Sequence, residues 1–260
     1  MPIAAFYENI RTGALEKGIS MTEAVSRLRE SGMDGIYICL DSVREYPDEI
    51  EEVIRTTGVC VTGLHAWIDF GRNPEGYQEL VDAAVRLKTD HVLIVPTCED
   101  EEEPLPVLLC GMRKAVLYGK DRGIRVFMED LDQKDSLYNS LGGLQMFLSD
   151  VPGLFCCFDT GNFIMHQEDE LEAAKLLRDF IFAMHLKDRT IVPENPDDIG
   201  KKILDGTLRY PVPVGSGYIK IREILNLVYD VPVIVELYDY SPSQMLEGIR
   251  RSVEWVSTYV

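Results

Sequence analysis

The sequence predicts an α/β protein built as a single-domain (β/α)8 (TIM) barrel over residues 1–260, and three observations carry this prediction. The chain has 260 residues, which matches the roughly 250 residues of a typical eight-stranded barrel. Eight short apolar runs, rich in Val, Ile and aromatic residues, recur along it. Amphipathic stretches with helical spacing separate these runs.

The apolar runs are the expected strands. They are apolar throughout instead of alternating, which is typical of parallel strands buried on both faces. Most of their starts lie about 30 residues apart, the length of a strand-helix-strand unit. From the N-terminus, the expected strands lie at residues 3–7, 35–40, 59–67, 91–96, 124–130, 154–159, 181–186 and 232–238.

The stretches between them are the expected helices. Several begin near Ser, Pro or Asp and end near Gly, which are the residues that favour helix starts and ends. Examples are residues 21–32, 47–58, 74–88 and 168–180. A doubly wound open sheet has the same alternation, but the Gly-rich phosphate-binding turn that it usually carries after its first strand is missing here. The barrel is therefore favoured.

The interval before the last expected strand is longer than the others and contains an insertion at about residues 190–218. This segment is rich in Pro and Gly, and it follows the seventh strand, so in a barrel it belongs to the C-terminal face. It could serve as a lid over a site or be a loop without function, and the sequence does not choose between the two.

The charge excludes some partners. The chain carries 44 acidic and 26 basic residues, a formal charge of −18 at pH 7. Such a chain repels phosphate backbones and anionic lipid surfaces, so we expect neither nucleic acid nor membrane as a partner. The six cysteines form no Cys-x-x-Cys pair, and the start of the chain lacks the features of a secretory signal. We therefore expect a cytoplasmic protein with reduced cysteines.

Ionisable residues stand at the ends of four consecutive expected strands. In a barrel, the C-terminal ends of all strands meet at one mouth, where active sites lie. Burying several carboxylates there is costly unless a cation compensates. The sequence therefore predicts one divalent metal ion, held by Glu129, Asp159, His185 and Glu236.

The donor set favours particular metals. Three carboxylates and one imidazole form a mainly oxygen set, which suits Mn²⁺, Mg²⁺ or Co²⁺ better than a thiolate-seeking metal, with Zn²⁺ as a further possibility. The alternative interpretation, that an acid caps a helix or pairs with a base, stays open for any one of these residues. It is much weaker for all four together.

Other residues are candidates for substrate contacts at the mouth. His65, at the end of the third expected strand, could bond a substrate oxygen. Trp67 and Tyr7 could supply an apolar platform for a sugar, or be plain core residues. Lys187 could orient a hydroxyl and stabilise negative charge, or form a structural salt bridge with a neighbouring Asp.

Five motifs together resemble the xylose-isomerase-like barrel superfamily of sugar isomerases, ketose 3-epimerases, inosose dehydratases and apurinic-site endonucleases. They are VFMED with Glu129, CCFDTGN with Asp159, HLKD at residues 185–188, PVGSG at 213–217 and VIVEL with Glu236. HLKD followed by the PVGSG element is the most specific part. The resemblance runs over most of the chain.

The resemblance implies a mechanism. In that superfamily the matching Glu, Asp, His and Glu bind one divalent ion, and the two Glu residues act as acid and base, here Glu129 and Glu236. The leading expectation is a metal-dependent isomerase or epimerase that acts on a ketose or related polyol ketone through a metal-stabilised enediolate. The second is an inosose-type dehydratase with the same metal site. The third is a non-catalytic sugar-binding barrel.

Some positions depart from the pattern. Asn162 stands where epimerases and endonucleases usually carry a His, so one substrate or metal contact is altered. The further histidines of a trinuclear zinc cluster are missing, since Val95 and Pro96 occupy the fourth strand's end, and this argues against DNA repair. Arg189 lies closer to His185 than the arginine that contacts substrate in ketose epimerases, and both Arg189 and Asn162 are candidate substrate contacts by this resemblance. An unphosphorylated sugar is preferred, and the resemblance suggests a homodimer or homotetramer.

Overall fold

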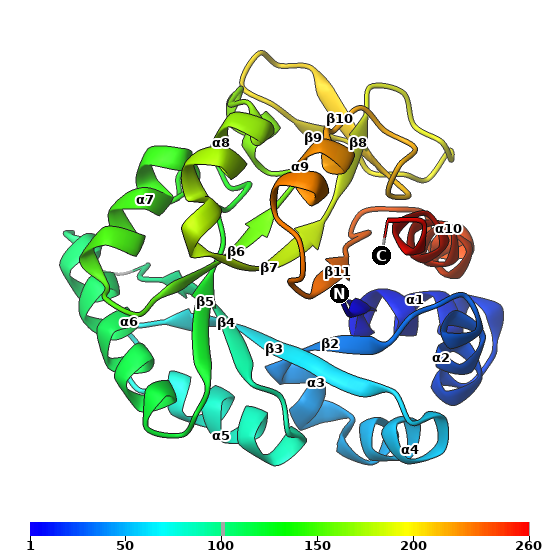
Figure 1. Ribbon diagram of the computed structural model, residues 1–260, viewed down its shortest axis with the longest axis horizontal. Coiled ribbons are helices and arrows are strands. Elements are labelled where there is room, and N and C mark those ends of the chain that lie inside the picture. The colour runs from blue at the N-terminus through cyan, green and yellow to red at the C-terminus, as the bar shows by residue number, and fades with distance from the viewer. Residues whose placement is uncertain (100–101, 260) are drawn as a thin grey trace.

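Eight parallel strands close into a barrel in the computed structural model, which describes residues 1–99 and 102–259 (Figure 1). Around the barrel the strands follow the order β1-β11-β7-β6-β5-β4-β3-β2. Their bounds are β1 Ile3–Phe6, β2 Gly35–Cys39, β3 Cys60–Asp69, β4 His91–Thr97, β5 Arg125–Met128, β6 Phe155–Asp159, β7 Ile181–Leu186 and β11 Val233–Val235. Each expected strand overlaps one of these, and the predicted (β/α)8 barrel is confirmed.

Helices surround the barrel and cover the outer face of its strands (Figure 1). The α-helices are α1 Tyr7–Lys17, α2 Met21–Glu30, α3 Leu40–Glu45, α4 Pro47–Thr57, α5 Tyr77–Leu87, α6 Pro104–Lys120, α7 Leu141–Asp150, α8 Glu170–Leu177, α9 Ile221–Leu227 and α10 Met245–Ser257. Short 3-10 helices lie at Phe163–His166, Arg178–Phe180 and Pro242–Gln244. None of the described helices has the length and apolar character needed to cross a bilayer.

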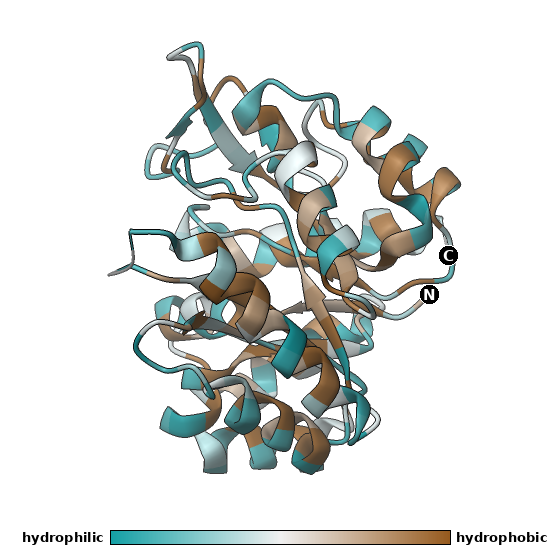
Figure 2. Cartoon of the chain, turned by 90° about the vertical axis from the view of Figure 1, so that its left-hand side faces the viewer, coloured by the Kyte–Doolittle hydropathy of each residue, from teal (hydrophilic) through white to brown (hydrophobic). Residues whose placement is uncertain are grey.

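The strands are apolar because both of their faces are buried. One face packs against the surrounding helices, and the other fills the barrel interior, where Phe6, Tyr37, His91 and Phe127 lie among the buried residues. The helices carry one hydrophobic and one hydrophilic side (Figure 2). In α4, for example, Ile50 and Val53 are buried while Asp48, Glu51 and Glu52 are exposed. This burial of apolar surface is the main force that closes the barrel.

The insertion contains a small antiparallel sheet that the sequence did not indicate. Its strands are β8 Asp188–Thr190, β9 Lys201–Lys202 and β10 Leu208–Val212, in the order β8-β10-β9. From β9, the Lys201 amine lies 2.6 Å from Asp132 Oδ2 and 3.5 Å from Asp239 Oδ2. Asp132 follows β5 and Asp239 follows β11, so this lysine reaches the C-terminal face of the barrel.

Asp188 joins the HLKD motif to the PVGSG element. Its Oδ2 accepts hydrogen bonds from the N–H groups of Gly215 and Gly217, each at 2.9 Å, and its Oδ1 accepts from Ile219 N–H at 3.2 Å. Gly215 has φ +84°, and a Cβ on Gly217 would lie 2.2 Å from Asp188 Oδ1. The two glycines therefore let the turn wrap around one buried carboxylate.

Replacing the buried Asp188 by Ala leaves three N–H groups, of which that of Ile219 is buried, without their acceptor, so we expect the free energy of unfolding to fall by about 3 kcal/mol. Urea denaturation followed by circular dichroism measures this loss. The exposed Asp179→Ala variant is the control and should unfold like the wild type. Equal stability of the two variants would contradict the role given to Asp188.

Candidate metal centre

Four side chains from adjacent strands converge at the C-terminal mouth of the barrel. Glu129 directly follows β5, Asp159 ends β6, His185 lies near the end of β7, and Glu236 directly follows β11. Each offers one ligand atom, and these atoms all lie within 4.8 Å of one another. The barrel closure produces this arrangement, because the strand order places β5, β6, β7 and β11 side by side.

His185 lies between the two glutamates. Its Nδ1 is 2.8 Å from Glu129 Oε2 and 3.3 Å from Glu236 Oε2. The register of the sheet fixes this position, since His185 pairs with Asp159 on one side and with Ile234 on the other. Asp159 and His185 are buried at 0% and 1% exposure.

Lys187 provides the positive charge nearest to these carboxylates. Its amine lies 2.7 Å from Asp159 Oδ2 and 2.6 Å from Glu236 Oε1. It also donates a hydrogen bond of 2.9 Å to Asn162 Oδ1, and the amide of Asn162 in turn donates to the backbone oxygen of Asp130. Lys187 thus pairs with Asp159, while Asp188 turns away to hold the PVGSG element.

Burial and neighbouring charge shift the pKa values of this cluster in opposite directions. Burial raises the pKa of Asp159 to about 7, with Glu236 and Glu129 adding to the effect and Lys187 opposing it. Burial also raises the pKa of Glu236, but Lys187 and His185 outweigh it, and the net pKa lies below the usual range. Burial lowers the pKa of His185, yet its contacts with Cys157 and Glu129 bring the net pKa well above normal.

These four residues fit a divalent cation. Ligand atoms at the 2.0–2.6 Å typical of oxygen-bound divalent metals span at most about 5 Å across the ion, and the four atoms here lie within that span. His185 Nδ1 faces both glutamates, and the Lys187 ammonium is paired with Asp159 and Glu236, so the buried negative charge gathers around one point. One cation among three carboxylates would offset the cost of burying them. The cluster could therefore hold one metal ion.

The cluster forms one wall of a pocket of about 260 Å³ at the barrel mouth. This is slightly below the roughly 300–1,000 Å³ typical of small-molecule sites, which favours a molecule of monosaccharide size. Apolar side chains make up much of the remaining wall. The pocket is lined by Phe6, His65, Trp67, Leu93, Val95, Glu129, Leu131, Asp132, Asn162, His185, Lys187, Lys201, Glu236, Tyr238 and Asp239.

Four of the six residues proposed for substrate contacts from the sequence, His65, Trp67, Asn162 and Lys187, line this pocket, and Trp67 keeps half of its surface exposed. Tyr7 and Arg189 are not among the lining residues. Tyr7 begins α1, is fully buried and donates a hydrogen bond to Glu49, so the preceding Phe6 takes the place at the mouth. Arg189 is buried with its guanidinium 3.6 Å from Asp132.

Several pocket residues were missed from the sequence. Asp132 lies two residues beyond the expected fifth strand, and Tyr238 is the last residue of the expected eighth strand, so a search of all polar and aromatic residues around each strand end finds both. Lys201 comes from the insertion, where no periodicity indicated its position. Glu8 stands in the first turn of α1 and approaches His65, with 3.7 Å between Glu8 Oε2 and His65 Nε2.

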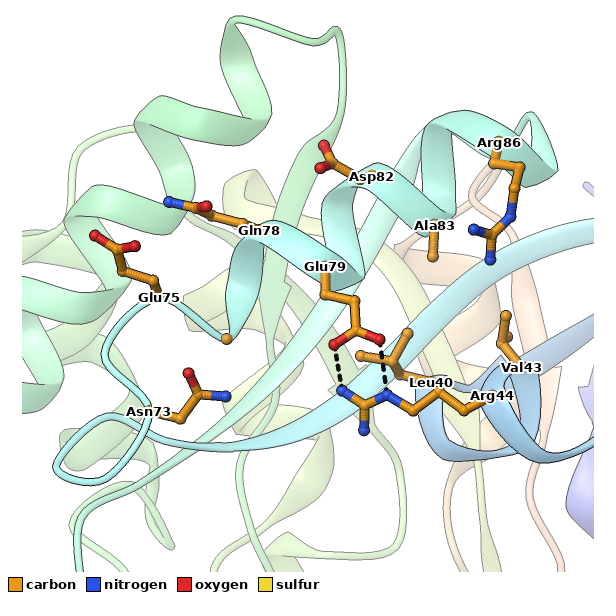
Figure 3. Close-up of a pocket in the computed structure, with 11 residues that line it drawn as sticks. Leu40, Val43, Arg44, Asn73, Glu75, Gln78, Glu79, Asp82, Ala83 and Arg86 are labelled. Carbon is orange, nitrogen blue, oxygen red and sulfur yellow. Dashed lines mark hydrogen bonds and ion pairs between the residues drawn. The ribbon is translucent and has the colours of Figure 1, made fainter.

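A second cavity lies on the outer side of the barrel, beside α3 and α5 (Figure 3). Its volume is about 570 Å³, larger than the pocket at the mouth. Arg44 and Glu79 form a two-point ion pair in its wall, with distances of 2.8 and 2.5 Å. Both side chains are about half exposed, and the described residues that line this cavity belong to α3, α5 and the loop before α5 instead of to strands. We therefore place the functional site at the barrel mouth.

Three solved structures illustrate the similarity of the fold. D-allulose 3-epimerase from Methylomonas sp. shares 12% identity with a TM-score of 0.73, covering 100% of this chain and 98% of that chain. The IolI protein with a bound zinc atom shares 16% with a TM-score of 0.73, covering 100% and 99%. The probable 3-DHS dehydratase AsbF from Bacillus anthracis shares 17% with a TM-score of 0.72, covering 99% of each chain.

Sequence comparison gives the family. No curated protein matches the chain. A family model described as xylose isomerase-like TIM barrel matches residues 25–259, which is most of the sequence and includes all four candidate ligands. Together with the closed barrel, this match confirms the resemblance found in the motifs. The chain belongs to the xylose isomerase-like TIM barrel family.

Proposed function

We propose that the protein is a divalent-metal-dependent isomerase or epimerase that acts on a ketose or a related polyol ketone. The observation that carries this proposal is the convergence of Glu129, Asp159, His185 and Glu236 within 4.8 Å at the mouth of the barrel. The proposal is supported by the family match and by neighbours in fold that include an epimerase and a protein with bound zinc. As cofactor we propose Mn²⁺, Mg²⁺ or Co²⁺, with Zn²⁺ as the alternative.

A divalent cation held by these four residues would supply positive charge beside a carbonyl oxygen and the hydroxyl oxygen of the neighbouring carbon, which would acidify the proton on the hydroxyl-bearing carbon. Glu129 and Glu236 come from β5 and β11, on opposite sides of β6 and β7. In this proposal one carboxylate removes the carbon-bound proton, and the other returns a proton to the enediolate. Return to the opposite face of the same carbon gives an epimer, and return to the neighbouring carbon gives an isomer.

Lys187 and Asn162 complete the proposed site. The ammonium group of Lys187 stays charged, because burial lowers its pKa but Asp159 and Glu236 raise it further, to a net value above normal. Its three N–H donors contact Asp159, Glu236 and Asn162 here, so one of them must leave its carboxylate, as cation binding to these acids would allow, before it can donate to a substrate oxygen on which negative charge develops. Asn162 holds this amine through a hydrogen bond of 2.9 Å, so the donor is oriented before substrate arrives.

A dehydratase is the second candidate function. The similar structure of the probable 3-DHS dehydratase AsbF favours it. The same proton removal would then be followed by loss of a hydroxyl group on the next carbon, and the Lys187 ammonium could protonate that leaving group. A non-catalytic sugar-binding barrel is the weakest alternative, because such a role requires no complete set of four ligands.

Metal analysis tests the cofactor. We expect about one equivalent of divalent metal per chain after incubation with Mn²⁺ or Mg²⁺, and an affinity at least about tenfold lower in His185→Ala and Glu236→Gln, because each loses a ligand. His166→Ala and Glu172→Gln are matched controls outside the pocket. Elemental analysis and titration calorimetry provide the numbers. Undiminished metal in both ligand variants would contradict the assigned centre.

A screen of ketoses with mass detection tests the reaction. An epimer or isomer keeps the mass of the substrate, whereas dehydration removes one water. With the substrate that turns over, Glu129→Gln and Glu236→Gln should each lower kcat by about 10²–10⁴, because each loses a proton-transfer group. The Glu172→Gln variant should keep the wild-type rate. Activity that survives both changes would exclude these carboxylates as acid and base.

Metal affinity should depend on pH. The raised pKa of Asp159, about 7 in the metal-free protein, means that a proton must leave this carboxyl before it can bind a cation at lower pH. We expect affinity to weaken as pH falls from about 8 to about 6 and proton release per ion to increase by about one. The stability of the metal-free protein has the opposite dependence on pH. Because folding raises the pKa of Asp159, the free energy of unfolding falls as pH rises toward 7.

Calorimetry in buffers of different ionisation enthalpy measures the protons released. Asp159→Asn is the control, because it binds metal more weakly but removes the titrating group, so its proton release should vary less over the same range. An affinity of the wild type that stays constant from about pH 6 to pH 8 would contradict the prediction.

A further inference from the structure

A second pair of ionisable side chains lies across the pocket from the candidate metal centre. Glu8 is in α1, directly after β1, and His65 is in β3. Going around the barrel from β7, β3 is the fourth strand in either direction, so His65 stands opposite His185. Both imidazole rings contact the Phe6 ring, with centroid distances of 5.2 and 4.9 Å. A molecule of monosaccharide size in the pocket can therefore contact both the candidate metal centre and His65.

The Glu8 carboxylate is fixed by one oxygen and free at the other. Its Oε1 accepts hydrogen bonds from Cys39 N–H at 2.9 Å and from Ser42 Oγ at 2.7 Å, at the start of α3. Its Oε2 lies 3.7 Å from His65 Nε2. Among the described residues, both of these facing atoms are buried without a hydrogen-bond partner. Buried polar atoms nearly always have a hydrogen-bond partner. A small side-chain rotation that brings Glu8 Oε2 and His65 Nε2 within hydrogen-bond distance would satisfy both atoms.

The imidazole ring is also fixed. Tyr37 stacks on His65 with an interplanar angle of 2° and a centroid distance of 5.5 Å, and the Phe6 ring meets it edge-on. His65 is 9% exposed and lines the pocket. With Nε2 directed toward Glu8, the other ring nitrogen, Nδ1, is left to interact with a bound molecule.

The charge of Glu8 decides which nitrogen carries the proton. Burial raises the pKa of Glu8, but His65, Ser42 and the Cys39 N–H lower it further, so the net pKa lies below the usual value. An ionised carboxylate only accepts hydrogen bonds. Nε2 must then be the protonated nitrogen, and in a neutral imidazole Nδ1 becomes an acceptor.

We propose that Glu8 is a positioning residue that holds His65 as its Nε2–H tautomer, so that Nδ1 accepts a hydrogen bond from a substrate hydroxyl remote from the reacting carbons. The role toward substrate rests on the proposed function. With the negative charge of Glu8 behind it, the acceptor His65 Nδ1 favours a substrate hydroxyl and disfavours a phosphate or carboxylate group of a substrate. The end of the substrate that lies against β3 is therefore an uncharged polyol chain.

The Glu8→Gln variant tests the pair directly. The amide oxygen introduced by this substitution can keep the two hydrogen bonds at the start of α3, so the NH2 group of the same amide turns toward His65 Nε2. A donor in that place requires an acceptor, and the proton of His65 should move to Nδ1. Ring nitrogen shifts in ¹⁵N NMR distinguish the two tautomers. The chain has only four histidines, and His65→Asn identifies the resonances of this one.

Glu16→Gln is the matched control, because it removes an exposed carboxylate from the same helix and should leave the tautomer unchanged. A wild-type His65 with its proton on Nδ1, or an unchanged tautomer in Glu8→Gln, would overturn the pairing. A thermal melt compares the folds, since loss of the hydrogen bonds from Cys39 N–H and Ser42 Oγ would lower the melting temperature without moving the proton.

Kinetics test the contact with substrate. With the ketose that turns over, Glu8→Gln and His65→Asn should each raise KM about tenfold with little change in kcat, because the hydroxyl contact is remote from the chemistry. An unchanged KM in both would overturn the proposed contact. Metal binding should stay at about one equivalent in both variants. If no metal binds and no ketose reacts, the proposed function fails, while the NMR result still decides whether Glu8 sets the tautomer.

Discussion

The concentration of buried charge at the barrel mouth is the constraint on which the rest of the structure depends. Three carboxylates, an imidazole and an ammonium group lie together in a buried space, where burying any one of these charged groups alone would cost free energy. Their separation is set by strand ends, which are the most rigid parts of the barrel. The apolar strands thus hold charges at distances that flexible loops could not maintain, and such rigidity is what metal binding and proton transfer both need.

The two sides of the mouth have different chemical characters. Strands β5, β6, β7 and β11 present the candidate ligands, whereas the wall from β1 to β4 presents Phe6, Trp67, Leu93 and the histidine on β3. In our proposals, reaction chemistry belongs to the first wall and recognition to the second. Substitutions in the second wall could then change which sugar is accepted while the metal centre stays intact.

Much of this could be predicted from the sequence, because the signals were local. A continuously apolar run indicates a buried strand, and an acid or histidine at its end points to the mouth, as Asp159 and Glu236 do. Tyr7 shows the limit of that argument, since one residue decides whether a side chain faces the mouth or begins a helix. Glu8 gave no signal, because an acid in the first turn of a helix is already explained by the helix dipole. Lys201 depends on how a loop folds back, which no local pattern encodes.

The insertion after β7 is fastened at both of its ends. Pairing between β8 and β10, together with the hydrogen bonds that Asp188 accepts from the N–H groups of residues 215–219, holds the two ends of the insertion together next to the barrel. The chain between them leaves and returns at nearly the same place, so its length can change at a small cost in loop-closure entropy. The exposed turn at residues 204–207, between β9 and β10, is therefore a natural place for evolution, or for an engineer, to insert a longer segment or a whole domain without displacing the four candidate ligands or Lys201.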